Sequence, residues 1–204
     1  MSAVYAVGRF QPPTIGHASM IQAVIALAKE KDADAFVFVS STQGTGKERI
    51  KNPLTSTQKV KYLYLMFPTG VTFINTVECS TPCGGPIGGR SWLNNKGYTK
   101  LTLMAGSDRE RDFGPAAPMW KNDPPAFVAL PRTDSGMSGT KARQFVTTKN
   151  IESFRKAVMF GDMTISDADA LYEDVKKGLI AAAAPKPRGG KTRRRKRARS
   201  TRRK

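Results

Sequence analysis

The sequence predicts an α/β domain with a parallel sheet of five strands. Five short apolar runs, typical of buried strands, alternate with stretches whose apolar residues recur at helical spacing. A C-terminal tail of 20 residues leaves about 184 of the 204 residues, which is ample for one domain. The hydrophobic content of 39% excludes a wholly disordered chain. In such a sheet, ligands bind beside the carboxyl ends of the strands.

The five strands are predicted from their apolar residues and the breakers that follow them. The first, residues 4–7, runs into a turn rich in Gly and Pro, and the second, residues 35–39, contains only Ala, Phe and Val. The third and fourth are residues 71–74 and 101–105, and a proline directly follows the fifth, residues 127–130. None of these runs approaches the roughly 18 apolar residues of a membrane span.

Helical periodicity predicts helices between and after these strands. In the first of them, Met20, Ile21 and Val24 fall on one face. Ser166 is the expected N-cap of the last, because Asp169 follows three residues later. Polar loops are expected after the second strand and over residues 79–89. The predicted helices are residues 17–30, 56–67, 91–96, 139–148, 151–160 and 167–180.

The charge of the chain is unevenly distributed. Lys and Arg total 34 against 16 Asp and Glu, a net of +18, and residues 185–204 alone hold 12 of the bases and no acid. Residues 1–184 therefore carry 34 − 12 − 16, or +6. We expect a folded domain over residues 1–184 and a disordered basic tail over 185–204. Cys79 and Cys83 are expected to be reduced loop residues in a soluble intracellular protein, since two thiols make neither a disulfide scaffold nor a complete zinc site.

The strongest candidate site follows the first strand. The run from Gly8 to His17 joins a strand to a helix, and His17 is the only histidine of the chain. A helix N-terminus offers unpaired N–H groups and a positive dipole end, which suit phosphate. Gly8 and Gly16 allow close approach, Thr14 supplies a hydroxyl, and His17 supplies a hydrogen-bond donor. These residues indicate a phosphate-binding turn.

Three motifs together resemble the nucleotidylyltransferase superfamily. The run Gly8-Arg9-Phe10 to Gly16-His17 is similar to its HxGH or TxGH signature, with Thr at position 14 as in phosphopantetheine adenylyltransferases. Its Gly-x-Asp element and its later Ser-Gly-Thr-x-x-Arg element are matched by residues 106–108 and 138–143. The resemblance spans residues 4 to about 160 and is strongest to small members from phages and large DNA viruses. It implies a Rossmann-like nucleotidylyltransferase fold with helices on both faces of the sheet.

The resemblance also implies roles for individual residues. His17 would donate to the transferred phosphoryl group, Thr14 would donate to an α-phosphate oxygen, and Arg143 would bind the leaving pyrophosphate. Gly16 would make room for the nucleoside, and Asp108 would lie beside the ribose. The remaining residues implied to bind nucleotide are Gly8, Arg9, Phe10, Gly106, Ser138, Gly139, Thr140, Lys47 and Lys51. The last two, with Arg49, lie on the predicted polar loop, where a solvated face is an equal alternative.

The expected reaction is in-line attack of an acceptor phosphate on the α-phosphorus of a nucleoside triphosphate, with release of pyrophosphate. Mg²⁺ would be bound through the nucleotide phosphates, with no metal ligands from the protein. Gly8-Arg9-Phe10 favours ATP, as in nicotinamide-nucleotide adenylyltransferases, whereas the run from Arg132 to Ser138 resembles cytidylyltransferases and leaves CTP open. Nicotinamide mononucleotide is the first candidate acceptor.

The basic tail supports an alternative function. Twelve positive charges in 20 residues favour non-specific contact with nucleic-acid phosphates, and the tail has no aromatic residue for base stacking. The alternative is therefore a non-catalytic nucleic-acid-binding or virion-associated protein on a nucleotidyltransferase-like fold. The expected location is the cytoplasm or nucleus of the host, or the virion, and no contact with a membrane is expected.

Overall fold

The computed structural model describes residues 1–42, 47–121, 123–131 and 136–183. The expected basic tail, residues 185–204, and the Arg132-Thr133 pair lie outside the described residues. Within them, no helix is both long and apolar enough to cross a membrane.

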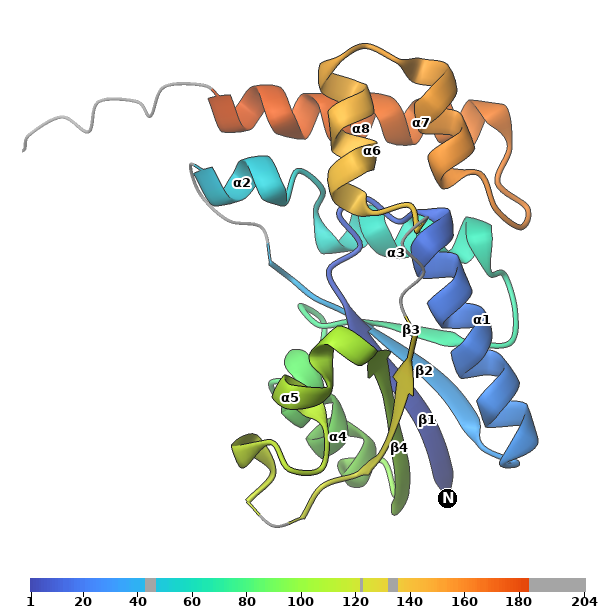
Figure 1. Ribbon diagram of the computed structural model, residues 1–204, viewed down its shortest axis with the longest axis vertical. Helices are drawn as coiled ribbons and strands as arrows, with labels where there is room; N and C mark the ends of the chain where they lie inside the picture. The colour runs from blue at the N-terminus through green and yellow to red at the C-terminus, as the bar shows by residue number, and fades with distance from the viewer. Residues whose placement is uncertain (43–46, 122, 132–135, 184–204) are drawn as a thin grey trace, which may run out of the picture.

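A parallel five-stranded sheet forms the centre of the molecule, in the order β3-β2-β1-β4-β5 (Figure 1). This confirms the predicted fold class and all five strands. Ala3 of β1 pairs with Asp34 of β2 on one side and with Leu101 of β4 on the other, so β1 lies at the centre of the sheet. The strands are β1 (Ser2–Gly8), β2 (Asp34–Val39), β3 (Thr72–Asn75), β4 (Lys100–Gly106) and β5 (Ala126–Leu130).

Most helices lie where their periodicity predicted them. The α-helices are α1 (Ile15–Glu30), α2 (Lys47–Lys51), α3 (Ser56–Met66), α4 (Gly85–Asn95), α5 (Glu110–Phe113), α6 (Gly139–Thr147), α7 (Ile151–Val158) and α8 (Ile165–Ala183). Two short 3-10 helices, η1 (Ser107–Arg109) and η2 (Pro118–Trp120), complete the described elements.

Three details of the helix prediction are wrong. α4 begins at Gly85, well before the predicted residue 91, because a proline occupies its first turn, where the missing N–H costs nothing. Part of the predicted polar loop after β2 forms α2. α8 begins at Ile165 rather than after Ser166, because Thr164 and Asp167 cap each other: the Thr164 hydroxyl accepts from the Asp167 N–H at 3.2 Å, and the Asp167 carboxylate accepts from the Thr164 N–H at 3.0 Å.

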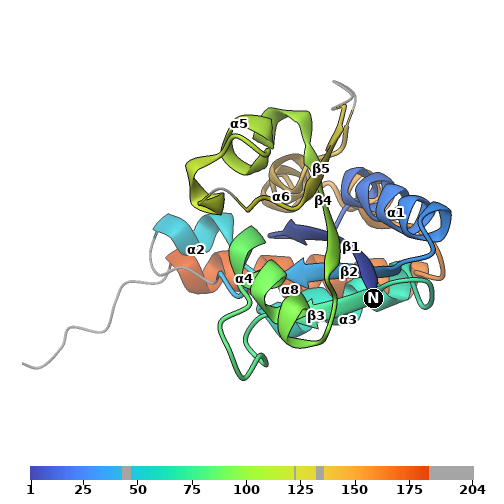
Figure 2. The ribbon, with the colours of Figure 1, turned by 90° about the horizontal axis from the view of Figure 1, so that it is seen from below.

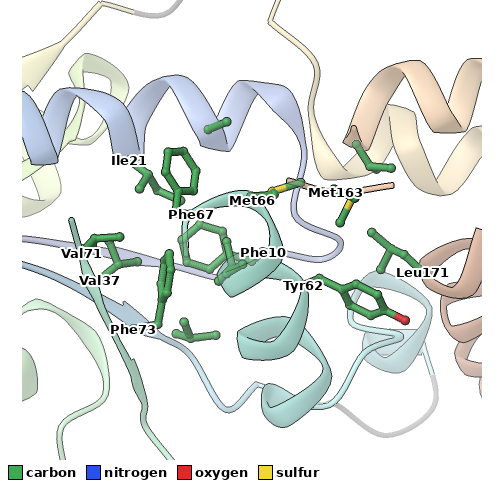
Figure 3. Close-up of a cluster of buried hydrophobic side chains, with 14 of the residues drawn as sticks. Phe10, Ile21, Val37, Tyr62, Met66, Phe67, Val71, Phe73, Met163 and Leu171 are labelled. Atoms are coloured by element: carbon green, nitrogen blue, oxygen red, sulfur yellow. The ribbon is translucent and has the colours of Figure 1, made fainter. Parts of the chain in front are cut away.

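Helices cover both faces of the sheet, as predicted (Figure 2). Alternate residues of β1 divide between the two sides: Val4 and Ala6 join the larger core under α1 and α3, whereas Ala3 and Tyr5 join the smaller core under α4. Figure 3 shows part of the larger core, in which Phe10 lies among Val37, Tyr62 and Met66. The turn that follows β1 is thus anchored in the main hydrophobic core.

The last three helices form a layer across the carboxyl ends of the strands (Figure 1). This layer docks through very close backbone contacts at glycines. A Cβ on Gly178 of α8 would lie 2.2 Å from the carbonyl oxygen of Pro53, and one on Gly161 would lie 2.1 Å from that of Met66. Any side chain at these positions would push the layer away from the rest of the domain.

Cys79 and Cys83 form a disulfide between β3 and α4. The prediction of reduced cysteines is therefore wrong for this structure. The two half-cystines are four residues apart in a loop, with their Cα atoms 6.1 Å apart. Cys83 is fully buried in the smaller core, so the bond ties the loop to the face covered by α4.

Candidate active site

The turn between β1 and α1 is held by a buried glutamine. Gln11 precedes Pro12 in the cis form. Its side chain accepts from the backbone N–H of Leu54 at 2.9 Å and donates to the Leu54 carbonyl at 2.8 Å. Both backbone groups of Leu54 thus bond to the Gln11 side chain, as they would to a neighbouring strand. Gln11 therefore links the turn after β1 to the segment before α3. Gln11 was not predicted as a site residue, because the sequence does not show that its side chain bonds to the distant backbone of Leu54.

Thr14 and His17 occupy the first turn of α1. The Thr14 carbonyl accepts from the backbone N–H groups of His17 and Ala18, so Thr14 is the N-cap. Its hydroxyl lies 2.8 Å from Nδ1 of His17 and donates to the carbonyl oxygen of Met137 at 2.9 Å. The side chain is completely buried. The expected donation from Thr14 to an α-phosphate therefore does not fit this geometry, because its only hydroxyl proton is already in use.

The segment before α6 packs directly onto this turn. A Cβ on Gly16 would lie 2.2 Å from the Met137 carbonyl oxygen, and one on Gly139 would lie 2.7 Å from the Gln11 carbonyl oxygen. Gly16 thus makes room for the protein backbone, where the resemblance had implied room for a nucleoside. The two glycines bring together two helix N-termini that are more than 120 residues apart in sequence.

The N-terminus of α6 carries the second half of the predicted site. Ser138 is its N-cap and accepts from the Lys141 N–H at 3.2 Å, while Thr140 is exposed on the first turn. Arg143 donates to the Gln11 carbonyl and, at 3.1 Å, to the Thr140 hydroxyl. The structure therefore places Arg143 between α6 and the turn after β1.

Arg143 and the exposed Arg9 form a pair of cations at this junction. Burial, and then the nearby charge of Arg9, lowers the pKa of the Arg143 guanidinium. No ion pair joins either arginine to a carboxylate within the described residues. Two guanidinium groups that repel each other, with no carboxylate partner in the described part of the chain, create a strong local preference for an anion.

Phe10 and Gly8 support the site from the protein interior. Phe10 is fully buried at a positive φ of 47°, and its ring lies over Gly8, where a Cβ would be 2.4 Å from it. The same ring contacts His17, with ring centroids 5.1 Å apart. The Phe10 side chain therefore fixes the position of His17 and has no surface of its own for a nucleotide.

The other predicted residues lie farther from this junction or have other partners. Gly106 ends β4, the neighbour of β1, and Asp108 follows in η1, with one carboxylate oxygen 3.7 Å from Nε of Arg109. The Lys51 ammonium pairs with Glu48 at 3.0 Å on the exposed surface of α2. Lys47 lies at the start of α2, and its side chain is outside the described structure.

A buried lysine, missed by the sequence analysis, lies at the carboxyl end of β2. Lys59 of α3 is completely buried and donates to the carbonyl of Ser40, the residue after β2. Burial lowers the pKa of Lys59 to about 8. Its spacing with Tyr62, Leu63 and Met66 places it on the apolar face of α3, but lysines are rarely fully buried, so the sequence analysis did not single it out.

The strand order and the glycine-rich turn after the central strand define a Rossmann-like α/β protein. Residues 5–114, more than half of the chain, match the model of a family described as cytidylyltransferase-like, and the chain belongs to this family. No curated protein matches the sequence. The family match covers the first turn, Gly106 and Asp108, and ends before α6.

Solved structures extend the similarity to most of the chain. A protein from Vibrio parahaemolyticus described as a nicotinate-nucleotide adenylyltransferase is 16% identical, with a TM-score of 0.54 over 86% of this chain and 95% of that one. The nicotinic acid mononucleotide adenylyltransferase of Plasmodium falciparum, solved with NaAD, is 12% identical, with a TM-score of 0.53 over 84% and 97%. Its complex with APC gives a TM-score of 0.51, with the same identity and coverage. At these identities the similarity establishes a shared nucleotidylyltransferase fold.

Proposed function

We propose that this protein is a nucleotidylyltransferase that transfers a nucleoside monophosphate from a nucleoside triphosphate to a small phosphorylated acceptor, with release of pyrophosphate. The observation that carries the proposal is the junction of two helix N-termini, α1 and α6, at which Arg9 and Arg143 lie without an acidic partner among the described residues. Both helix dipoles and both arginines favour a polyanion there. A triphosphate has the charge and length for such a junction.

The proposed roles follow from where each group lies. His17 stabilises the charge that develops on the transferred phosphoryl group, and Arg143 holds the leaving pyrophosphate with the N–H groups at the start of α6. No covalent intermediate is needed, because positioning and charge stabilisation suffice for this reaction. Asp108, at the end of the neighbouring strand, is the proposed ribose contact.

Mg²⁺ is the proposed cofactor, bound through the nucleotide phosphates. The described residues contain no group of three or more His, Cys, Asp or Glu side chains that could hold a metal ion. When bound, Mg²⁺ would neutralise phosphate charge. Lys47 and Lys51 remain proposed phosphate contacts. Lys51 can serve as one only if its pair with Glu48 opens, because that ammonium is already paired.

ATP is the proposed nucleotide, with CTP as the alternative, and a pyridine mononucleotide is the proposed acceptor. The Gly8-Arg9-Phe10 run favours adenylyl transfer, and the similar structures are described as adenylyltransferases of nicotinate or nicotinic acid mononucleotide. Nicotinamide mononucleotide and nicotinic acid mononucleotide are therefore the first acceptors to test.

The test is pyrophosphate release from ATP and CTP, each with a panel of phosphorylated acceptors. We expect turnover with ATP and one pyridine mononucleotide, and a loss of about 10²- to 10³-fold in kcat for His17→Ala, the usual effect of removing one such donor. Ser19→Ala, an exposed change on the same helix, is the matched control and should retain full turnover. Absence of pyrophosphate release with every pair would refute the proposed activity and favour the nucleic-acid-binding alternative.

A further inference from the structure

The hydroxyl of Thr14 has one proton, and the structure shows where that proton goes. A carbonyl oxygen can only accept, so the 2.9 Å contact with Met137 requires the hydroxyl to donate. The second contact, 2.8 Å to Nδ1 of His17, must then be one in which the hydroxyl accepts. It follows that Nδ1 of His17 carries a proton.

We propose that Thr14 is a positioning residue that fixes the tautomer of His17, with Nδ1 as the permanently protonated nitrogen. The neutral and the charged ring then differ only at Nε2, which has a lone pair in the neutral ring and an N–H in the imidazolium. This step rests on the proposed function: if His17 donates to phosphate from Nε2, it does so as the imidazolium. Thr14 then acts through His17 and makes no contact with the nucleotide.

Three further contacts keep this arrangement in place. The ring of Phe10 packs against His17 with an interplanar angle of 57°, which limits rotation of the imidazole. The missing side chain of Gly16 lets the Met137 carbonyl reach the Thr14 hydroxyl. Because Met137 immediately precedes the N-cap of α6, the tautomer of His17 depends on correct docking of the helix that carries Arg143. The two halves of the proposed site are thus linked through one hydroxyl group.

His17 is the only histidine in the chain, so its tautomer can be measured without assignment. The experiment is ¹⁵N NMR of the full chain with ¹⁵N-labelled histidine, at a pH high enough for the ring to be neutral. We expect Nδ1 to show the shift of a protonated nitrogen and Nε2 that of an unprotonated one. A neutral ring protonated at Nε2 in the wild type would overturn the proposal, whatever the activity of the protein.

Two substitutions at position 14 complete the test. Thr14→Val keeps the shape but removes the hydroxyl, so the neutral ring should shift toward the Nε2-protonated form and kcat should fall on the order of 10²-fold through misplacement of the ring. Thr14→Ser restores the hydroxyl and should restore both the tautomer and most of the turnover. Thr164→Val, which removes a capping hydroxyl from α8, controls for stability and should change neither.

The outcomes separate this inference from the proposed function. An unchanged tautomer in a folded Thr14→Val protein would refute the role of Thr14, even if nucleotidyl transfer is confirmed. The expected tautomer in a protein without transferase activity would support the positioning role and refute the proposed function. The wild-type spectrum remains decisive if Thr14→Val does not fold.

Discussion

Replacement of Gly16 by alanine tests the assembly of the site most directly. In an ordinary helix, Gly→Ala stabilises by up to about 1 kcal/mol. Here the new Cβ would lie 2.2 Å from the Met137 carbonyl oxygen, although real Cβ contacts essentially never fall below 3.0 Å. The two backbones must therefore separate by about 1 Å, which brings the contact just above the 3.0 Å limit.

That separation breaks the buried hydrogen bond of Thr14. Its 2.9 Å contact with the Met137 carbonyl would lengthen to about 3.9 Å, beyond hydrogen-bonding range. Loss of this bond costs about 1–3 kcal/mol, and overpacking costs a similar amount. After subtraction of the helical gain, we expect a net destabilisation of about 1–5 kcal/mol. A displacement of this size at the site also predicts a loss on the order of 10²-fold in kcat.

The assays are urea unfolding and steady-state turnover, with Gly84→Ala as the control. Gly84 is the N-cap of α4 at an ordinary φ of −74°, and a Cβ added to it would meet no atom within 4 Å, so the change there should cost only the cap preference, about 1 kcal/mol, and leave kcat unchanged. A Gly16→Ala protein as stable and as active as the wild type would refute the close contact and the argument built on it.

Three further predictions concern single groups and the tail. Arg143→Lys should weaken ATP binding about 10-fold or more in a titration, because one ammonium cannot replace a fork that contacts two protein acceptors and, in the proposed function, a phosphate. Arg155→Lys, which disturbs a two-bond pair with Asp169, should alter stability alone. Lys59 has a pKa lowered to about 8 from 10.5, so the unfolded chain binds more protons between these values and the free energy of unfolding should rise as pH increases from about 8. Lys59→Met should abolish that rise in urea titrations at several pH values, and an unchanged slope would contradict the buried charge. A chain ending at residue 184 loses 12 positive charges and should keep its kcat while losing most affinity for duplex DNA and most of the salt dependence of binding; loss of turnover in the folded truncated chain would show that the tail belongs to the active site.

The strands of the sheet and the start of α6 could be predicted from sequence because they depend on local patterns. Apolar runs identified all five strands, and Ser138 was recognisable as the residue before a helical pattern. The short α2 was missed because five residues give no periodicity to detect. Thr14 and Gly16 were recognised, but the groups that they contact were not. Their shared partner is the main-chain carbonyl of residue 137, and a carbonyl has no sequence signal.

Pairing of the cysteines could not be decided from sequence either. Cys79 and Cys83 were correctly placed in a loop, but whether they bond depends on the backbone path between them. Lys59 illustrates the same limit for charge. Its helical spacing placed it on the apolar face of α3, but the Ser40 carbonyl that accepts from its ammonium lies on another element and has no local signal.

The glycine contacts that dock the C-terminal helical layer have a consequence for how such sequences diverge. Gly139, Gly161 and Gly178 each meet a main-chain carbonyl, an atom that every amino acid supplies equally. These contacts therefore place no demand on the side chains of the partner residues, provided that the glycines stay and the backbone keeps its path. A contact of this kind preserves the packing of two elements while it constrains very few residue types. It offers one physical reason why similar folds persist at 12–16% identity.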